Sequence, residues 1–220
     1  MENLSNSELV LIGITGGISS GKTAFAQYLA ELGYTIIYTD QLAKEIISTN
    51  SIVKNQIINT FGENSFIDGK YNTDYISEIV FNDNSELDKL NRIVFPVVID
   101  KLVAEIDKLQ INNGSSIKDK LLFIESALLF EFNIDGGFDY IISVSSNIEN
   151  RKERLKNKLN ISDNELMKRI NIQMSQEEKN KLSDFVIENN GTIKDLENSA
   201  SFLLPILKSL PNKEDYAEDK

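Results

Sequence analysis

The segment that most constrains this chain is GGISSGKT, residues 16 to 23, which follows the apolar run LVLIGIT at residues 9 to 15. Its spacing is G-x-x-x-x-G-K-[ST], the pattern of a loop whose backbone N–H groups wrap a phosphate group. Phe25, Leu29 and Leu32 follow at helical intervals, and Gly33 comes where a glycine commonly ends a helix. We therefore expect a strand at about 9–14, a phosphate-binding loop, and a helix from about Gly21 to Leu32.

The residues of this loop have distinct expected tasks. Lys22 would reach the β- and γ-phosphates of a nucleotide, and Thr23 would offer its hydroxyl to Mg²⁺. Ser19 and Ser20 lie in the cradle, where their N–H groups matter more than their side chains. Because the pattern lies between an expected strand and an expected helix, we interpret it as a nucleoside triphosphate site. The expected contacts are Gly16, Gly17, Ser19, Ser20, Gly21, Lys22, Thr23 and Ala24.

Composition narrows the chemistry. The 220 residues include no cysteine and no histidine, which excludes disulfides, thiolate ligands and imidazole bases. A general base must then be Asp or Glu, and a catalytic metal would be oxygen-bound, which favours Mg²⁺. The net charge of −11 disfavours non-specific binding to nucleic acid, which needs a basic surface. No apolar run is long enough to span a membrane and the start is unlike a secretory signal, so we expect a cytoplasmic protein without membrane partners.

The order of apolar segments predicts an α/β fold. A second run, YTIIYT at 34–39, leads to Asp40, and further strand signals occur at 121–126, 139–144 and 185–188. Strands separated by helices favour a parallel sheet with crossover helices. Helices are expected near 42–48, 51–60, 73–81, 85–94 and 97–109, with Pro96 at the start of the last, before a polar loop at 111–119.

The C-terminal third is expected to be helical apart from the strand at 185–188. The segments SDNE at 162–165 and SQEE at 175–178 have the S-x-x-E spacing of capping boxes. Another helix is expected to begin near Thr192, and Pro205 should kink or end it.

Nucleotide binding alone is compatible with a switch, a motor or a kinase. A guanine-specific switch needs N-K-x-D, and the nearest match, NKLN at 157–160, lacks the aspartate. A kinase needs a carboxylate to receive the proton of its acceptor. Asp40 stands at the end of the second expected strand, at the sheet edge where ligands gather. An aspartate at this place equally suits the N-cap of a helix at 42–48, so the residues leave both interpretations open.

Four later segments are informative through their order and spacing. They are YTDQLAKEI at 38–46, LLFE at 128–131, RLKNKLNISDNELMKRINIQM at 154–174 and DFVIENNG at 184–191. Together with the loop they resemble the dephospho-coenzyme A kinase family over nearly all of residues 9–209. The resemblance implies transfer of the γ-phosphate of ATP to the ribose 3′-hydroxyl of dephospho-coenzyme A.

The resemblance also implies an architecture. A P-loop kinase domain over 1–210 would have a five-stranded parallel core at 9–40, 120–150 and 184–209. A helical acceptor-binding insert would cover about 41–118, and a helical lid about 151–182. Residues 211–220 would form a disordered tail.

Roles for individual residues follow from the same resemblance. Asp40 would orient the acceptor hydroxyl and take its proton, and Lys22 would stabilise charge on the transferring phosphoryl group. Thr23 would bind Mg²⁺ directly, and Glu125 would hold it through water unless it is only an exposed carboxylate at a strand end. The remaining implied contacts are an apolar acceptor wall of Leu128, Leu129 and Phe130, a lid cation at Lys158 and an adenine-side Asn189. Core packing is an equal alternative for the three apolar residues.

The chain departs from the family pattern at several positions. Ser19 replaces a glycine, which stiffens the loop if φ is positive there. Lys158 replaces an arginine and loses the bidentate fork. Phe95 and Ala127 replace a histidine and a proline that the family often has.

Asp40, Lys22 and Thr23 match the family pattern, so we expect a working enzyme. We also expect it to be a monomer or a weak homo-oligomer. Two alternatives stay open from the sequence. One is a kinase of another nucleotide-like acceptor, and the other is a non-catalytic ATP-binding sensor.

Overall fold

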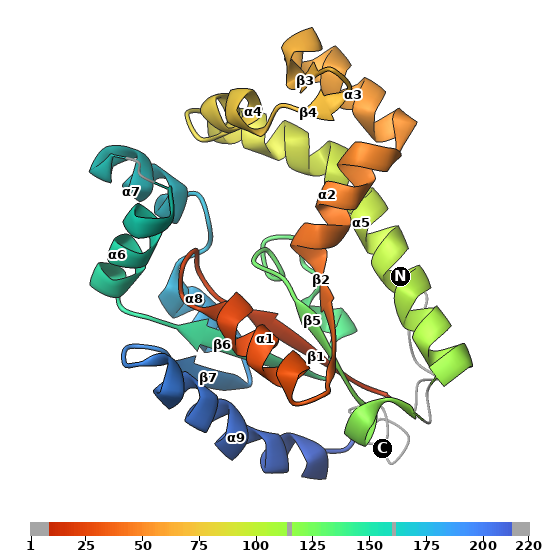
Figure 1. The fold of residues 1–220 in the computed structure, drawn as a ribbon, viewed down its shortest axis with the longest axis vertical. Helices are drawn as coiled ribbons and strands as arrows, with labels where there is room; N and C mark the ends of the chain where they lie inside the picture. Colours follow the sequence, from red (N-terminus) through yellow and green to blue (C-terminus); the bar gives the residue numbers. More distant parts are fainter. Residues whose placement is uncertain (1–8, 114–115, 160–161, 213–220) are drawn as a thin grey trace. The chain divides into compact units, whose positions relative to one another are not determined.

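Five strands form one sheet in the order β2-β5-β1-β6-β7. They are β1 Val10–Thr15, β2 Thr35–Tyr38, β5 Leu121–Glu125, β6 Tyr140–Ser145 and β7 Phe185–Glu188. The structure is a computed structural model that describes residues 9–113, 116–159 and 162–212. The chain divides into two compact units, Tyr38–Ile106 and the remainder, and the sheet belongs to the second of these (Figure 1). The predicted parallel five-stranded α/β fold is confirmed.

The centre of the sheet is β1, which pairs in parallel with β5 on one side and β6 on the other. Every residue of β1 and of β5 is buried, as expected for central strands covered on both faces, whose sequences are nearly continuous apolar runs. The register places Ile14 beside Glu125 and Thr15 beside Ser143. The carboxyl ends of these three strands therefore meet at one edge of the sheet.

Helix α1, Lys22–Glu31, packs on the sheet through Phe25, Ala26 and Leu29. It lies beside α9, Ile193–Ser209, and the two helices cover part of the sheet (Figure 1). The end of α1 follows the predicted glycine signal, because Gly33 N–H donates to Ala30 O and Tyr34 N–H donates to Leu29 O. The spacing of apolar residues and the glycine at position 33 thus determine where α1 lies and where it ends.

The other helices of this unit are α6 Ile148–Leu159, α7 Asp163–Asn171 and α8 Gln176–Leu182. The predicted capping boxes at Ser162 and Ser175 are both formed, with Glu165 and Glu178 as their partners. Short 3₁₀ turns lie at Lys118–Lys120 and Asp135–Gly137. Pro205 does not end α9, which continues to Ser209 because Leu203, Leu204 and Leu207 on both sides of the proline are buried.

The Tyr38–Ile106 unit consists mainly of helices, as the sequence predicts. They are α2 Thr39–Thr49, α3 Ser51–Phe61, α4 Thr73–Val80 and α5 Asn84–Asn113, the last of which runs on into the other unit. A 3₁₀ turn covers Glu63–Ser65. The prediction of separate helices at 85–94 and 97–109 is wrong, because Pro96 lies inside α5. Val94, Val98, Leu102 and Ile106 are buried at four-residue intervals, so one continuous apolar stripe outweighs the hydrogen bond that the proline removes.

A small hairpin in this unit is not anticipated by the sequence analysis. Strands β3 Phe66–Ile67 and β4 Lys70–Tyr71 pair antiparallel around Asp68-Gly69, whose φ angles are 49° and 76°. Two positive φ values are what a two-residue hairpin with a type I′ turn requires, and Asp-Gly is a preferred sequence for it. The signal was present but lay within an otherwise helical region.

Two further observations complete the fold. Pro211 O accepts a hydrogen bond from Tyr140 Oη and Asn212 Nδ2 donates to Leu9 O, whereas residues 213–220 of the expected tail lie outside the described residues. In the part of the chain that is described, no helix has the length and apolar character to cross a membrane.

Candidate active site

The phosphate-binding loop connects the end of β1 to the start of α1, as predicted. Gly21 is the N-cap of α1, and Ser20 N–H donates back to Gly17 O at 3.1 Å. Within the described part of the chain, the N–H groups of Ser19, Gly21, Lys22 and Thr23 form no hydrogen bond. Such a row of open donors at a helix N-terminus is suited to an anion.

Ser19 meets the condition under which the sequence predicts a stiffer loop. Its φ is 59°, in the left-handed region where a Cβ atom is crowded. A non-glycine residue in that region costs on the order of 1 kcal/mol or more. The loop therefore holds strain that the glycine of the family pattern avoids.

Lys22 points to the carboxylate that ends β5. Its Nζ lies 3.8 Å from Glu125 Oε1, and Glu125 is only 3% exposed. The exposed strand-end alternative for Glu125 is therefore wrong. In the same first turn of α1, Thr23 is exposed and Ala24 is half-buried.

Asn189 lies directly after β7 and is buried against the loop. Its Nδ2 donates to Ser20 O at 2.8 Å and its N–H donates to Ser145 O at 2.7 Å. A Cβ atom at Gly21, where φ is 103°, would lie 2.0 Å from Asn189 Nδ2. Glycine is therefore required at position 21 both for its backbone angle and for this contact. Asn189 therefore contacts the loop, and its expected role near the adenine stays a prediction.

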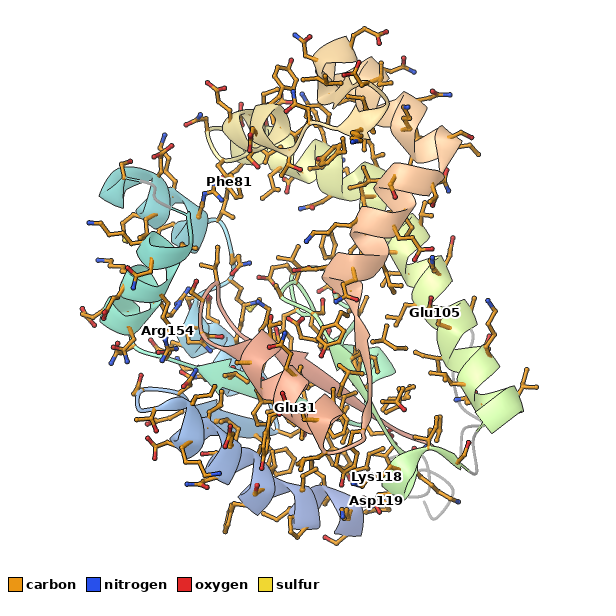
Figure 2. All side chains as sticks on the ribbon, viewed as in Figure 1. Glu31, Phe81, Glu105, Lys118, Asp119 and Arg154 are labelled. Carbon is orange, nitrogen blue, oxygen red and sulfur yellow. The ribbon has the colours of Figure 1, made fainter. Side chains whose placement is uncertain are left out.

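Arg154, labelled on α6 in Figure 2, forms hydrogen bonds to the backbone of the same loop. Its Nη1 donates to Ser20 O at 3.3 Å and to Ser19 O at 3.5 Å, and its Nη2 donates to Asn189 O at 2.9 Å. A charged residue on a polar helix such as α6 most often faces solvent. The structure instead uses its guanidinium to tie α6 to the loop and to Asn189.

Two glutamines contact the loop backbone, and the sequence analysis did not single them out. Gly17 N–H donates to Gln176 Oε1 and Ile18 N–H donates to Gln173 Oε1, both at 2.9 Å. Gln176 Nε2 in turn donates to Ser143 Oγ at 3.0 Å. Gln173 belongs to the segment at 154–174 that resembles the family, which could have marked it, whereas Gln176 lies outside that segment.

A buried ion pair supports this side of the site. Lys179 of α8 is 0% exposed, and its Nζ lies 2.7 Å from Glu131 Oε1 and 2.7 Å from Ala127 O. Burial lowers the pKa of Lys179, and the nearby Glu131 carboxylate opposes that shift. Met174 N–H also donates to Glu131 Oε1 at 3.0 Å. In the sequence, Glu131 is marked as the last residue of the LLFE segment. Lys179 is not marked, because it lies in a highly charged helix whose side chains would be expected to face solvent.

The three apolar residues of the predicted acceptor wall differ in burial. Leu129 and Phe130 are 0% and 5% exposed, and Leu128 is half-buried. Leu129 packs so closely on β1 that a Cβ atom at Gly13 would lie 2.6 Å from its Cδ1 atom. Core packing therefore accounts for Leu129, while the acceptor wall stays a prediction.

Asp40 lies in the Tyr38–Ile106 unit. The strand before it ends at Tyr38 and α2 begins at Thr39, so Asp40 is an exposed residue in the first turn of α2. The prediction that Asp40 ends the strand is therefore wrong by two residues, because β2 ends at Tyr38. The helix-capping alternative is wrong because the N-cap is Tyr38. Lys158 lies in α6, and its side chain is outside the described structure.

The donors expected for Mg²⁺ are all oxygen atoms. Among the described residues, no group of three or more acidic side chains is placed to hold a metal ion. The Thr23 hydroxyl and the Glu125 carboxylate nevertheless suit Mg²⁺, which keeps several waters and binds substrate phosphates with few protein ligands. The residues present fit this ion.

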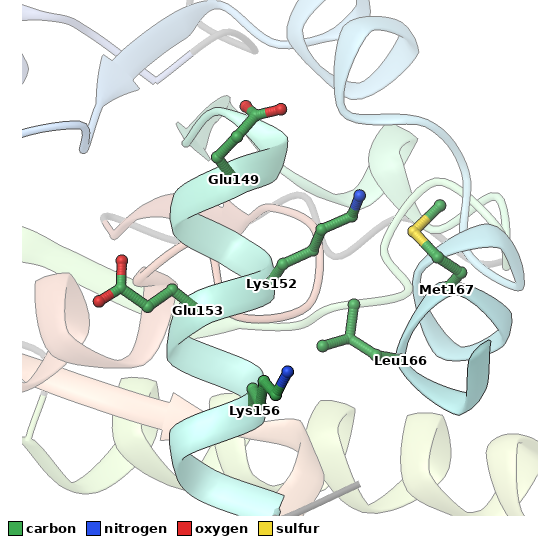
Figure 3. Close-up of a pocket in the computed structure, with 6 residues that line it drawn as sticks. All are labelled: Glu149, Lys152, Glu153, Lys156, Leu166 and Met167. Atoms are coloured by element: carbon green, nitrogen blue, oxygen red, sulfur yellow. The ribbon is translucent and has the colours of Figure 1, made fainter. Parts of the chain in front are cut away.

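A hollow of about 340 Å³ lies outside the loop, between α6 and α7. Figure 3 shows the Lys152 side chain extending from α6 toward Met167 of α7. The other lining residues are Glu149, Glu153, Lys156 and Leu166. No residue of the phosphate-binding loop contributes to it.

Comparisons with known proteins agree on one family. The sequence profile of a family described as dephospho-CoA kinase matches residues 10–195. A dephospho-CoA kinase from Fusobacterium nucleatum is 38% identical, over 86% of this chain and 93% of its own length. One from Carboxydothermus hydrogenoformans is 35% identical, over 91% and 94% respectively.

Solved structures share the fold. A Thermus thermophilus protein aligns with a TM-score of 0.73 and 30% identity, over 90% of this chain and 98% of its own. A shikimate kinase from Acinetobacter baumannii has a TM-score of 0.53 at 15% identity, over 92% and 95%. The second likeness concerns the fold alone.

Proposed function

This chain belongs to the dephospho-CoA kinase family, and on that premise we propose that it transfers the γ-phosphoryl group of ATP to the ribose 3′-hydroxyl of dephospho-coenzyme A. The products are coenzyme A and ADP. The structural observation that carries the proposal is the set of open N–H groups at Ser19, Gly21, Lys22 and Thr23, beside the Lys22 side chain.

The donor half of the site is proposed to work by positioning and electrostatics. The loop N–H groups hold the β- and γ-phosphates, and Lys22 exchanges its contact with Glu125 for the transferring group, where it stabilises the developing charge. Thr23 and Glu125 would hold Mg²⁺, which neutralises phosphate charge when bound. Arg154, Gln173 and Gln176 keep the loop in its cradle shape through the hydrogen bonds described above.

The acceptor half is proposed to depend on Asp40. Its exposed carboxylate orients the 3′-hydroxyl and receives its proton. In a loose transition state the proton leaves late, so that orientation contributes more than basicity. The Tyr38–Ile106 unit is proposed to bind the acceptor and the α6–α8 segment to act as a lid.

The alternatives left open by the sequence are not favoured. The matched family and the curated relatives described above carry the same name. The cytoplasmic location and the monomeric or weakly oligomeric state stay predictions.

The test incubates the purified protein with Mg²⁺-ATP and dephospho-coenzyme A. We expect a product heavier by one phosphoryl group, identified by mass spectrometry and assigned to the 3′ position by phosphorus NMR. Asp40→Asn should lower kcat/KM by about 10²–10⁴-fold, because general-base and orienting contributions are of that size.

Asp74→Asn is the matched control. Asp74 is also exposed and also lies in the first turn of a helix, α4, so the same charge is removed from the same kind of position. We expect its kcat/KM to stay at the wild-type value. An untouched acceptor would refute the function, and an Asp40→Asn enzyme as active as Asp74→Asn would refute the role of Asp40 alone.

A further inference from the structure

Arg151 is almost completely buried beside the phosphate-binding loop. It lies in the first turns of α6 and is 6% exposed. Its Nε donates to Ile18 O at 3.0 Å. Within residues 9–113, 116–159 and 162–212, this is the only hydrogen bond of the Arg151 side chain, and no carboxylate pairs with it. The Nη1 and Nη2 donors therefore have no protein acceptor there.

The guanidinium lies directly against the loop. A Cβ atom at Gly17 would be 2.5 Å from Arg151 Nη2 and 2.7 Å from Cζ. Only a residue without a side chain leaves this space at position 17. The glycine thus brings the terminal nitrogens of Arg151 next to the loop backbone.

The other cations around the loop already have partners. Lys179 is paired with Glu131, Lys22 faces Glu125, and Arg154 donates to backbone carbonyls. Burial lowers the pKa of Arg151, whose charge is thus largely shielded from water and has no carboxylate partner among the described residues. A buried, unpaired guanidinium is costly, and an anion with several acceptor oxygens relieves that cost.

We propose that Arg151 binds the phosphoryl groups of the donor nucleotide through Nη1 and Nη2, as a second cation beside Lys22. The proposal rests on the proposed function, of which it names a further binding residue. Arg151 would then supply from α6 the kind of cation that the family resemblance implies at Lys158.

Phosphoryl groups could reach Arg151 from two sources, because the acceptor also carries a diphosphate. The donor is favoured because Arg151 is hydrogen-bonded to Ile18 and packed on Gly17, which both belong to the loop that holds the donor. The experiment therefore titrates both compounds separately.

Binding is measured by calorimetry with ATP, ADP, AMP and dephospho-coenzyme A in the presence of Mg²⁺. Arg151→Gln keeps a side chain that can pack on Gly17 and donate to Ile18 O, but it removes the charge. We expect its affinity for ATP to fall about tenfold to a hundredfold, the effect of losing hydrogen bonds to a charged group. Affinity for AMP should change by less than about twofold. Arg151→Lys should be intermediate because it keeps the charge without the fork.

Lys152→Gln is the matched control, since Lys152 is the next residue of α6 and lines the outer hollow of Figure 3. Its nucleotide affinities should equal those of the wild type. Thermal unfolding separates binding from structure. Arg151→Gln should unfold no lower than the wild type, because it removes an unpaired buried charge. If it does not fold, Arg151→Lys carries the binding test.

Three results would overturn the proposal. They are an unchanged ATP affinity, an equal loss for AMP and ATP, and a loss confined to dephospho-coenzyme A, which would make the acceptor the source of the anion. The ATP titration needs no acceptor chemistry. A wild-type protein that binds ATP but leaves dephospho-coenzyme A untouched would therefore refute the proposed function and still test Arg151.

Discussion

Ser19 is the clearest point of strain in the active site. Its φ of 59° places a Cβ atom in the left-handed region, and replacement by glycine removes that penalty at the expense of a more flexible unfolded chain. We expect Ser19→Gly to raise the free energy of unfolding by about 0.5–1 kcal/mol, measured by urea denaturation.

Ser19→Ala provides the control for this substitution. It keeps the Cβ atom and removes only the hydroxyl, so its stability should stay near that of the wild type. A Ser19→Gly protein that is less stable than Ser19→Ala would show that φ strain is not what this residue contributes.

The positions of some site residues could be predicted from the sequence, and those of others could not. The loop residues could be placed because their spacing after an apolar strand specifies them, whereas the expected role of Glu125 came from the family resemblance. Arg151 and Lys179 could not, since a charge on a polar helix normally faces solvent. Their burial depends on which helix face meets the loop, and that is decided by tertiary packing.

Helix α8 is anchored at its buried face by the Lys179–Glu131 ion pair, with Lys179 0% exposed. Removing one partner of a buried pair leaves the other uncompensated. Because the Glu131 side chain is 19% exposed and keeps its hydrogen bond from Met174 N–H, we expect Lys179→Met to lower the free energy of unfolding by about 1–3 kcal/mol in chemical denaturation.

Lys181→Met is the control on the same helix. Lys181 and Glu177 form an exposed pair, which contributes little to stability in solution, so its removal should be nearly neutral. Adding Glu131→Gln to Lys179→Met should recover part of the loss, because the uncompensated carboxylate is then neutral. A strictly additive double variant would show that the two side chains are not coupled.

Elements were predicted best where a start and a stop signal agree. Helix α1 has the phosphate-loop glycine before it and Gly33 after it, and the capping boxes at Ser162 and Ser175 fix two more helix starts. The errors occur where a local signal competes with packing. Pro96 predicted a helix boundary, but a buried stripe carries α5 through it. The hairpin at Asp68-Gly69 was missed, because its turn sequence lies within a region that is otherwise helical.

At the scale of the whole molecule, the parallel sheet follows from the sequence because its strands alternate with helices. The division of the chain at Ile37 and Ile106 does not follow in this way. It depends on which helices contact one another, and local patterns carry no information about that.

The whole molecule also has an unusual titration, because it contains no histidine. The carboxylates with lowered pKa values include Glu165, Glu178 and Asp195, and hydrogen bonds from Ser162, Ser175 and Thr192 at helix starts cause the shifts. A carboxylate whose pKa is lower in the folded state stabilises the fold above its ordinary pKa. That contribution is lost as the pH falls through the folded value. We therefore expect the free energy of unfolding to be flat between about pH 5.5 and 7.5 and to decline below about pH 4.5.

Urea denaturation at half-unit pH intervals measures this profile. Asp195→Asn should lower the plateau, because the capping box of α9 is weakened, and should make the acid decline shallower, because one titrating group is gone. The shallower decline is the informative result, since any destabilising substitution lowers the plateau, but only removal of a titrating carboxylate changes the proton uptake on unfolding. A decline in the free energy of unfolding centred near pH 6.5 would contradict this explanation, because a carboxylate with a lowered pKa does not take up its proton at that pH.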